Sequence, residues 1–525
     1  MKLRTIVKIA ATSSVVLLCA GFALYSFFGL SGAKEKNDFD LYELVPSSVA
    51  AVFVTDDVME FVEEIDGLTC SKNNQYLHVS KLFSNLKQSL YTLLDDAPHG
   101  LSHQMNQMLI SFHKPDNIRN QVLYCRLAEG DRELINSFEQ KYISSLYPPK
   151  TSSYRGEEIT IYPMADGDFL ACYLTPEFIA LSYQKKLIED VIDARKGGQS
   201  LADDPTFTET RTPKKSAATA SVYARMDGMI GWTEFDMKLK DDFIYFSGIS
   251  HAADSCFTFI NLLQQQESVK GFPGETLPST AFYFSKQGIT DWTSLFTYGS
   301  MQEYAAADRT GEVMERDKEL SRYLMENAGP DLIACLFQRE DTVQGAAAVL
   351  SLSVADVTEA ERVLRSLVKT APEEEGMRKT PRITFCYTAN KAYPVYRLPQ
   401  TTLFTQLTSF AQPTLRVYAT FYGGRLLLAP DEDSLSRYIH QLEKGEVLTG
   451  AVAYRAGMDS LSDSCQLMLM ADFDQVLGQS ESQVSFVPDF FLRNDDFFRN
   501  FILFAQFTCA DGVVYPNIVL KYKTE

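Results

Sequence analysis

The first hydrophobic segment of the chain runs from Ile9 to Leu30 without a charged residue, and Lys2, Arg4 and Lys8 lie directly before it. About 20 apolar residues in a helix span the roughly 30 Å hydrocarbon core of a bilayer. Basic residues before such a segment favour keeping its N-terminal end in the cytoplasm. We therefore expect residues 1–33 to be a single-pass anchor in the inner (cytoplasmic) membrane, with the C-terminal ectodomain in the periplasm or otherwise outside the cytoplasm.

Two other interpretations of this segment stay open. A cleavable signal peptide has an apolar core of about 7 to 15 residues followed by small residues. The sequence Ser31-Gly32-Ala33 supplies the small residues, although the core here is longer. A bacterial lipoprotein signal is the other alternative, because Cys19 lies within the apolar run; such signals normally have a small residue before the cysteine, and Leu18 is large.

The hydrophobic pattern after the anchor occurs twice. Residues 173–182 predict a turn and a buried strand, followed by an amphipathic helix that ends at Gly197. Residues 421–430 predict the same strand, followed by a helix that ends at Gly445. The spacing from strand to glycine is the same in both copies. This agreement indicates an internal repeat.

Other landmarks repeat in the same order. Pro46-Ser47 precedes an apolar strand at residues 50–54, and Pro278-Ser279 precedes one at residues 281–284. Each half closes with a predicted hairpin, whose turn lies at residues 241–242 in the first half and 511–512 in the second. Ordered agreement of this kind predicts that the exported part arose by gene duplication.

We therefore predict two similar tandem α+β units at residues 41–270 and 271–525, each a mainly antiparallel sheet with helices on one face. The opening elements alternate as strand, helix, strand, strand, helix, strand, which is compatible with a ferredoxin-like βαββαβ layer. In the first unit these elements are expected at residues 50–54, 81–94, 105–111, 122–127, 131–144 and 158–162.

The duplicated Pro-Ser pair before a short apolar strand, at Pro46 and Pro278, resembles a group of bacterial envelope proteins of unknown function. In that group a single N-terminal anchor precedes a duplicated ectodomain with a later strand-helix-Lys-Gly unit, here at Lys196-Gly197 and Lys444-Gly445. The resemblance covers most of the exported chain and implies a location and an architecture. It supplies no catalytic residue.

Composition limits the partners. The chain of 525 residues carries a formal charge of −19, so its surface repels nucleic acid and anionic lipid headgroups. We expect proteins of the envelope as partners and no nucleic acid, with membrane contact through the N-terminal helix and any small-molecule ligand unknown. Nine cysteines without a C-x-x-C pair fit small buried side chains, although an oxidising compartment would permit disulfides.

Motifs for catalysis are missing from the sequence. It contains no phosphate-binding loop, dinucleotide-binding glycine motif, G-x-S-x-G elbow or H-E-x-x-H pair. Ser182 and Lys185 match S-x-x-K without the motifs that accompany it in penicillin-binding folds. His99 and His103 have the i, i+4 spacing of metal ligands, but Gly100 between them favours a loop. We predict no catalytic, cofactor-binding or metal-ligating residue and no cofactor.

A phenylalanine-rich segment near the C-terminus has no counterpart in the first half. Because aromatic side chains dominate many protein interfaces, we predict a partner-binding surface there, with ordinary core packing as the alternative. Its candidate residues are Phe486, Phe490, Phe491, Phe497 and Phe498.

The anchor, the repeat, the acidic surface and the missing motifs together favour a non-catalytic binding or scaffolding protein of the envelope that acts through protein–protein contacts. An envelope hydrolase with a dispersed active site is one alternative, and it requires His, Asp and Ser within hydrogen-bond reach. A periplasmic ligand-binding or chaperone-like module is the other, and it requires a large apolar groove.

Overall fold

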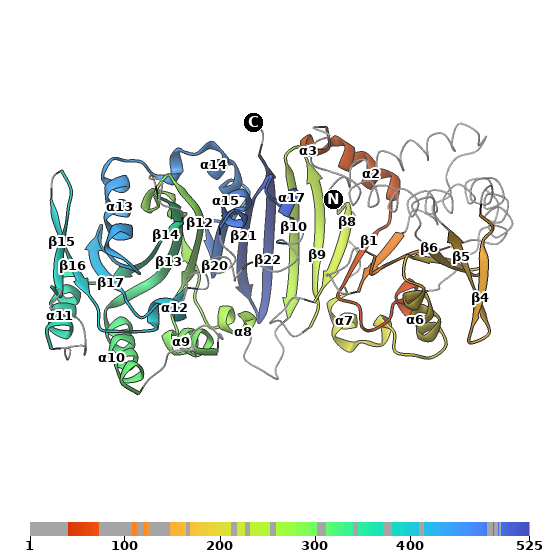
Figure 1. Ribbon diagram of the computed structural model, residues 1–525, viewed down its shortest axis with the longest axis horizontal. Coiled ribbons are helices and arrows are strands. Elements are labelled where there is room, and N and C mark those ends of the chain that lie inside the picture. The colour runs from red at the N-terminus through yellow and green to blue at the C-terminus, as the bar shows by residue number, and fades with distance from the viewer. Residues whose placement is uncertain are drawn as a thin grey trace. The chain divides into compact units, whose positions relative to one another are not determined.

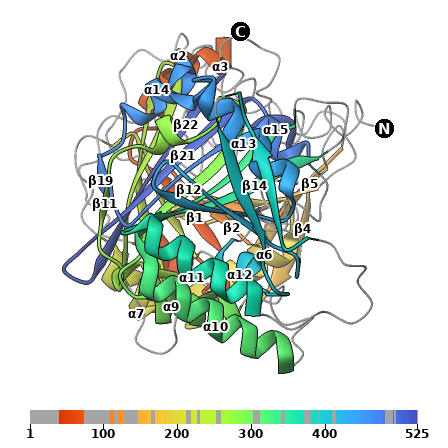
Figure 2. The same cartoon turned by 90° about the vertical axis from the view of Figure 1, so that its left-hand side faces the viewer.

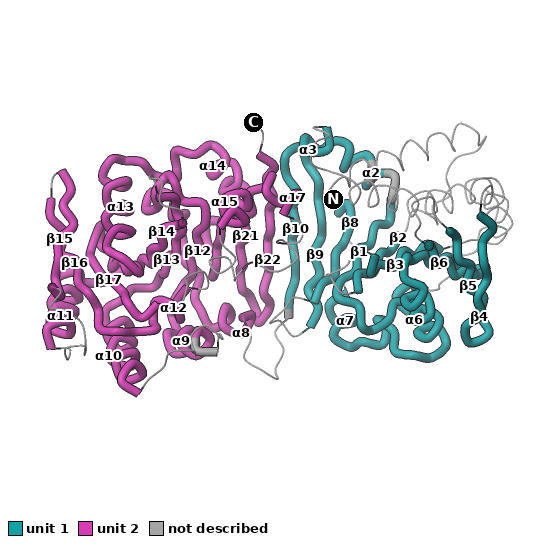
Figure 3. The backbone as a smooth tube through the Cα atoms, viewed as in Figure 1, with its two compact units in different colours: residues 1–250, 524 teal, residues 251–523, 525 magenta. Residues whose placement is uncertain are grey.

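The structure is a computed structural model, and it describes residues 40–72, 108–113, 119–126, 147–163, 169–211, 218–225, 231–251, 259–301, 311–339, 345–370, 381–389, 391–408, 414–479, 487, 492 and 495–523. These residues form two compact units, unit 1 within residues 1–250 and unit 2 within residues 251–523 (Figure 3). Both units are α+β, with an antiparallel sheet and helices packed against it.

Unit 1 is built on a sheet in which every pair of neighbouring strands is antiparallel. The spatial order is β4, β5, β6, β7, β3, β2, β1, β8, β9, β10 (Figure 1). The bounds are β1 Ala51–Thr55, β2 Met108–Phe112, β3 Gln121–Arg126, β4 Lys150–Tyr154, β5 Glu157–Pro163, β6 Phe169–Leu174, β7 Phe178–Ser182, β8 Ala220–Ala224, β9 Thr233–Lys240 and β10 Phe243–His251.

Helices cover both faces of this sheet. They are η1 Leu41–Leu44, α2 Val58–Gly67, α3 Thr69–Lys72, α6 Lys185–Arg195, η3 Leu201–Asp203 and α7 Pro205–Thr210. Val52 and Phe53 are successive residues of β1, so their side chains point to opposite faces. Val52 shares a core with Ile188 of α6, whereas Phe53 packs on Phe61 of α2 with ring centroids 5.0 Å apart. The predicted arrangement with helices on one face is therefore wrong for this unit.

The strands of unit 2 are also paired antiparallel, in the order β15, β16, β17, β18, β14, β13, β12, β20, β21, β22. The bounds are β12 Ala281–Gly288, β13 Ala328–Gln338, β14 Ala346–Val354, β15 Ile383–Tyr387, β16 Ala392–Arg397, β17 Tyr418–Tyr422, β18 Arg425–Ala429, β20 Leu467–Asp472, β21 Phe501–Ala510 and β22 Val513–Tyr522. A small separate sheet pairs β11 Val269–Lys270 with β19 Ser464–Cys465.

The helices of unit 2 also lie on both faces of its sheet (Figure 2). They are α8 Phe259–Gln264, η4 Pro273–Thr276, α9 Trp292–Met301, α10 Gly311–Asn327, α11 Val357–Thr370, α12 Leu403–Leu407, α13 Glu432–Glu443, η6 Leu448–Gly450, α14 Val452–Met458, α15 Phe473–Leu477 and α17 Asp495–Phe498. Helices α10, α11 and α12 pack against Leu428 of β18. On the opposite face, Tyr438 of α13 meets Phe337 of β13 with ring centroids 5.8 Å apart. The one-face prediction is wrong here as well.

The two units have the same strand order, with β15 of unit 2 in the place of β4, β16 in the place of β5, and so on to β22 in the place of β10. Helix α6 follows β7 and helix α13 follows β18. Each of these helices is followed by a glycine in the left-handed region, Gly197 at φ 88° and Gly445 at φ 73°, a conformation that a side chain would strain. The predicted unit of strand, helix and glycine is confirmed in both places.

The ferredoxin-like arrangement is wrong. That layer places its third strand between the first two, whereas here β2 lies between β1 and β3 and pairs with both. In a ferredoxin-like layer the fourth strand, here β5, would pair with β1. The other neighbour of β1 is instead β8, more than a hundred residues further along the chain, and β5 pairs with β6. The local sequence predicts each strand, but it does not fix these long-range partners.

Several predicted elements are confirmed within a few residues. The strands expected at 50–54, 105–111, 122–127 and 158–162 correspond to β1, β2, β3 and β5. The hairpin turns at Asp241 and at Asp511–Gly512 are also present, with φ values of 49°, 51° and 77° that suit two-residue turns. The helices expected at 81–94 and 131–144 lie outside the described residues.

The predicted anchor at residues 9–30 also lies outside the described residues. Among the helices of the described ranges, none is both long and apolar enough to cross a membrane.

Candidate functional site

The candidate site is the outer edge of the unit 2 sheet, where β15 is the last strand (Figure 1). Successive side chains of a strand point to opposite faces, so in β15 Ile383–Tyr387 the side chains of Phe385 and Tyr387 lie on the same face. Phe385 is 53% exposed and Tyr387 is 69% exposed, and their ring centroids lie 6.1 Å apart. An edge strand therefore carries two large aromatic side chains open to solvent.

The other face of β15 is fixed to α13. The hydroxyl of Thr384 donates a 3.0 Å hydrogen bond to Glu432 Oε2, and the thiol of Cys386 donates to Ser436 Oγ at 3.4 Å. Asp431 accepts a hydrogen bond of 2.7 Å from the backbone N–H of Ser434 and so caps the start of α13. These contacts hold β15 against helix α13, and they place the exposed carboxylate of Glu432 beside the strand.

Exposed aromatic side chains on a sheet edge suit binding better than catalysis. Tyr and Phe bury a large area when a partner covers them, and they lose little side-chain entropy. Unit 1 offers a direct comparison, because β4 has the same place in its strand order. The exposed residues of β4 include Thr151 and Ser153, which are small and polar. The aromatic residue of β4, Tyr154, is half-buried and donates a hydrogen bond to Asp193, so among the described residues the exposed side chains differ between the two edges.

The predicted phenylalanine segment is only partly described. Phe498 is 6% exposed and its ring lies 5.5 Å from that of Phe473. Phe497 lies 5.0 Å from the ring of Phe498 and 4.9 Å from that of Phe501 in β21. These two candidate residues thus pack within unit 2. Phe486, Phe490 and Phe491 lie outside the described residues, and partner binding by this segment stays a prediction.

One Ser–His pair does form in unit 1, as the hydrolase alternative requires. Ser111 Oγ lies 2.8 Å from His113 Nε2 and 3.2 Å from the hydroxyl of Tyr124. Burial lowers the pKa of His113 to about 4, against the opposing charge of Asp190. All three side chains of the cluster are buried, and Nδ1 of His113 has no hydrogen-bond partner among the described residues.

This Ser–His pair lacks the other parts of a nucleophilic site. In a catalytic triad the second ring nitrogen donates to a carboxylate, which orients the imidazole. The carboxylate of Asp190 instead forms an ion pair of 2.8 Å with Lys186. Ser111 is fully buried, so its hydroxyl is closed to a substrate. The geometry is that of a buried polar cluster in the core.

The weaker sequence motifs have structural roles. The hydroxyl of Ser182 donates to the carbonyl oxygen of Gln121 at 2.7 Å and accepts from the backbone N–H of Gln184. Lys185 forms an ion pair of 2.8 Å with Glu189 one helical turn later. His99 and His103 lie outside the described residues, and within those residues no group of three metal-binding side chains gathers.

Six described cysteines are free thiols: Cys70, Cys125, Cys335, Cys386, Cys465 and Cys509. Cys509 is half-buried, and burial raises its pKa to about 11; the others are buried. The interpretation as small buried side chains is confirmed for Cys125, Cys172, Cys335 and Cys386, whereas Cys509 is only half-buried. Cys19 and Cys256 lie outside the described residues.

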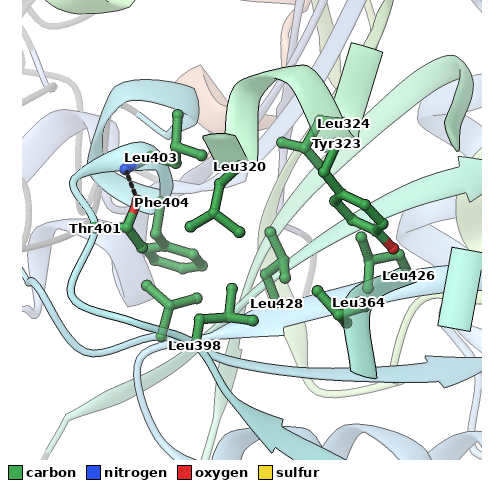
Figure 4. A pocket seen from close by; sticks show the side chains of 11 residues that line it. Leu320, Tyr323, Leu324, Leu364, Leu398, Thr401, Leu403, Phe404, Leu426 and Leu428 are labelled. Atoms are coloured by element: carbon green, nitrogen blue, oxygen red, sulfur yellow. Dashed lines mark hydrogen bonds between the residues drawn. The ribbon is translucent and has the colours of Figure 1, made fainter. Parts of the chain in front are cut away.

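An apolar pocket in unit 2 lies between helices α10, α11 and α12 and strand β18 (Figure 4). It encloses about 20 Å³, which is little more than the room for one water molecule. Beside it, Asp317 of α10 accepts hydrogen bonds from the hydroxyls of Thr401 and Thr402, each at 2.6 Å. Asp317 also accepts from the backbone N–H of Thr402 at 2.9 Å and so ties α12 to α10. At this size the pocket is a packing gap between helices.

Comparison with known proteins adds little. No family model matches the chain, and no curated protein matches it. Crystal form III of TP0453 aligns at 13% identity with a TM-score of 0.26, covering 45% of this chain and 91% of that chain. Crystal form I of TP0453 aligns at 10% identity with a TM-score of 0.25, covering 43% of this chain and 83% of that chain. At these TM-scores neither structure supports an argument about this protein.

Proposed function

We propose that this chain is a membrane-anchored envelope protein that binds or scaffolds other proteins through its exported units. The observation that carries the proposal is the pair of exposed aromatic side chains, Phe385 and Tyr387, on the edge strand of unit 2. A protein rarely leaves such side chains in solvent on an open strand edge unless something covers them, because bare apolar edges promote aggregation.

The apolar, uncharged sequence of residues 9–30 supports the proposed anchor, and the preceding basic residues support export of the rest. Gene duplication is part of the proposal. It is supported by the identical strand order of the two units and by the equivalent glycines Gly197 and Gly445.

Two observations favour binding over the alternatives. The Ser111–His113 pair is buried, and no carboxylate of the described residues orients the imidazole, which weakens the case for this pair as a hydrolase site. The pocket beside α10 encloses only about 20 Å³, so this pocket gives no support to a ligand-binding or chaperone-like module.

The test is in-cell crosslinking of the full-length chain, followed by purification from membranes and mass spectrometry. We expect one or a few envelope proteins at near-stoichiometric yield, and we expect the protein in the membrane fraction. Deleting residues 9–30 should release it from that fraction. Recovery of the protein alone, in repeated experiments with different crosslinkers, would contradict the binding function.

A further inference from the structure

Among the described strands, β15 pairs with β16 on one side only, and it also carries exposed aromatic rings. The backbone N–H of Arg397 donates to the carbonyl oxygen of Arg382 at 2.9 Å, and that of Thr388 donates to Lys391 at 2.9 Å. These two bonds lie at either end of the β15–β16 pairing, in which Phe385 is opposite Pro394. In an antiparallel ladder, hydrogen-bonded and non-bonded pairs alternate.

The alternation determines which groups point outward. Ile383, Phe385 and Tyr387 occupy the non-bonded positions, so their N–H and C=O groups point away from β16. Pro394, opposite Phe385, has no N–H and fits such a position. No strand among the described residues pairs with this outer side of β15. The edge thus presents three donors and three acceptors in the spacing of a β-ladder.

The two faces beside this edge differ in chemistry. A strand added there would place alternate side chains on the face of Phe385 and Tyr387, which is apolar and aromatic. Its other side chains would lie on the face of Thr384, next to the exposed carboxylate of Glu432 at the acidic start of α13. Apolar residues suit the first face and basic residues suit the second.

We infer that the outer edge of β15 binds an extended segment of another protein by strand addition, and that this segment alternates apolar or aromatic residues with lysine or arginine. The inference rests on the proposed binding function and names its partner class. Like the carboxylate of Glu432, the formal charge of −19 on the chain favours a basic partner. A second copy of this chain is the competing occupant.

Unit 1 supplies the matched control. A two-residue turn follows β4, and Tyr154 is the last residue before it. Thr151 lies three residues before Tyr154, just as Phe385 lies three residues before Thr388, the last residue before the turn that follows β15. Thr151 therefore also directs its N–H away from the neighbouring strand. Proline at either position removes one outward donor and leaves the ladder bonds of the hairpin intact.

The experiment measures binding of a fluorescent peptide of about eight residues, alternating lysine with valine or phenylalanine, to the full chain in detergent by anisotropy. A peptide of the same composition, with its lysines and apolar residues in separate blocks, is the control. We expect the alternating peptide to bind about tenfold more tightly than the block peptide. Phe385→Pro should weaken it at least about tenfold, and Thr151→Pro should leave it unchanged.

A second variant guards against misfolding of the proline variant. Phe385→Ser with Tyr387→Ser keeps every backbone donor and should still weaken binding several-fold, while Glu432→Gln should reduce the salt dependence. Equal binding of the two peptides, or equal binding by Phe385→Pro and Thr151→Pro, would overturn the inference. It would also fall if sedimentation showed a dimer of the wild type that Phe385→Pro dissolves, because a second copy would then occupy the edge.

These outcomes are separable from failure of the proposed function. If envelope partners are recovered in cells equally by the wild type and by the Phe385→Ser, Tyr387→Ser variant, the chain binds proteins at another surface. If the wild type recovers no partner, the proposed function fails, whatever the peptide shows.

Discussion

Phe385 and Tyr387 lie on the same face of β15 with ring centroids 6.1 Å apart, and both are more exposed than buried. Between them in the chain, Cys386 is buried and contacts α13. Within the described part of the chain, the side-chain hydrogen bonds of Thr384 and Cys386 hold the strand from the α13 face. The aromatic pair contributes little to the core of unit 2, and this makes its removal a clean test of function.

Replacing both Phe385 and Tyr387 by Ser should leave the stability of the protein nearly unchanged. Substitutions at exposed positions usually change the free energy of unfolding by less than about 0.5 kcal/mol each. Thermal unfolding followed by circular dichroism should give a Tm within about 3 °C of the wild type. A fall of 8 °C or more, on the order of 2 to 4 kcal/mol, would show that the rings serve folding instead.

The sequence predicted local structure better than it predicted the sheet. The alternation in residues 50–54 and the glycine after each amphipathic helix act over a few residues, so β1, α6 and α13 lie where we expected them. The pairing of β1 with β8 joins segments far apart in the chain, and no local pattern encodes it. That pairing decides the strand order, and with it the failure of the ferredoxin-like prediction.

Sequence reasoning did not predict the β15 edge as a candidate site, and the reason is similar. The alternating sequence of residues 383–387 was available as a strand signal, but whether a strand lies at an edge depends on every other strand. The phenylalanine segment gives a stronger sequence signal because its aromatic residues are close together in the chain. Of that segment, Phe498 is buried against Phe473, which sequence alone does not distinguish from an exposed ring.

Acidification should destabilise unit 1 through His113. Burial holds the folded-state pKa of this imidazole at about 4, below the ordinary value near 6.5. Between pH 6.5 and pH 4 the imidazole of the unfolded chain is protonated while that of the folded protein stays neutral. The contribution of His113 to the free energy of unfolding is therefore complete above pH 6.5 and is lost as the pH falls toward 4. The loss amounts to about 3 kcal/mol for this group.

The fluorescence of Trp232 reports on this unit. The chain has two tryptophans, and Trp292→Phe leaves only the one in unit 1. Urea unfolding of that variant at pH 7.5 and pH 4.5 should show the loss, and adding His113→Gln should reduce the pH dependence. An equal dependence with and without His113 would show that other groups cause it.

Asp204 should stabilise unit 1 through its hydrogen bonds. Burial opposes its ionisation, but bonds from Thr206, Trp232 and Arg225 outweigh that effect and hold its pKa at about 2. Its carboxylate caps α7 and accepts from Arg225 Nη2 at 2.6 Å. Asp204→Ala should cost about 1 to 2 kcal/mol at neutral pH, measured by urea unfolding.

The pH dependence of that cost has a definite sign. The folded-state pKa of Asp204 lies below its ordinary value of 3.8, so its contribution is complete above about pH 4 and is lost as the pH falls through 2. The difference between wild type and Asp204→Asn should therefore shrink on acidification. A difference that grows below pH 4 would contradict this assignment.

The thiols of Cys465 and Cys509 should react slowly, and the Tm of the protein should not depend on a reducing agent. Burial raises the pKa of Cys509 to about 11 and raises that of Cys465 as well, so little thiolate forms at pH 8. Labelling with a thiol reagent, followed by mass spectrometry of the peptides that contain Cys465 and Cys509, should be slow in the native protein and fast in denaturant. A Tm that falls in the presence of a reducing agent would instead reveal a structural disulfide.

The most direct test of the proposed function compares partner recovery in cells. Full-length wild type, the variant with Phe385→Ser and Tyr387→Ser, and a control with Thr151→Ala and Ser153→Ala on β4 are crosslinked, purified from membranes and quantified by mass spectrometry. We predict an envelope partner that wild type and control recover alike and that the β15 variant loses. Equal recovery by all three proteins, or no partner with any of them, would contradict binding through the β15 edge.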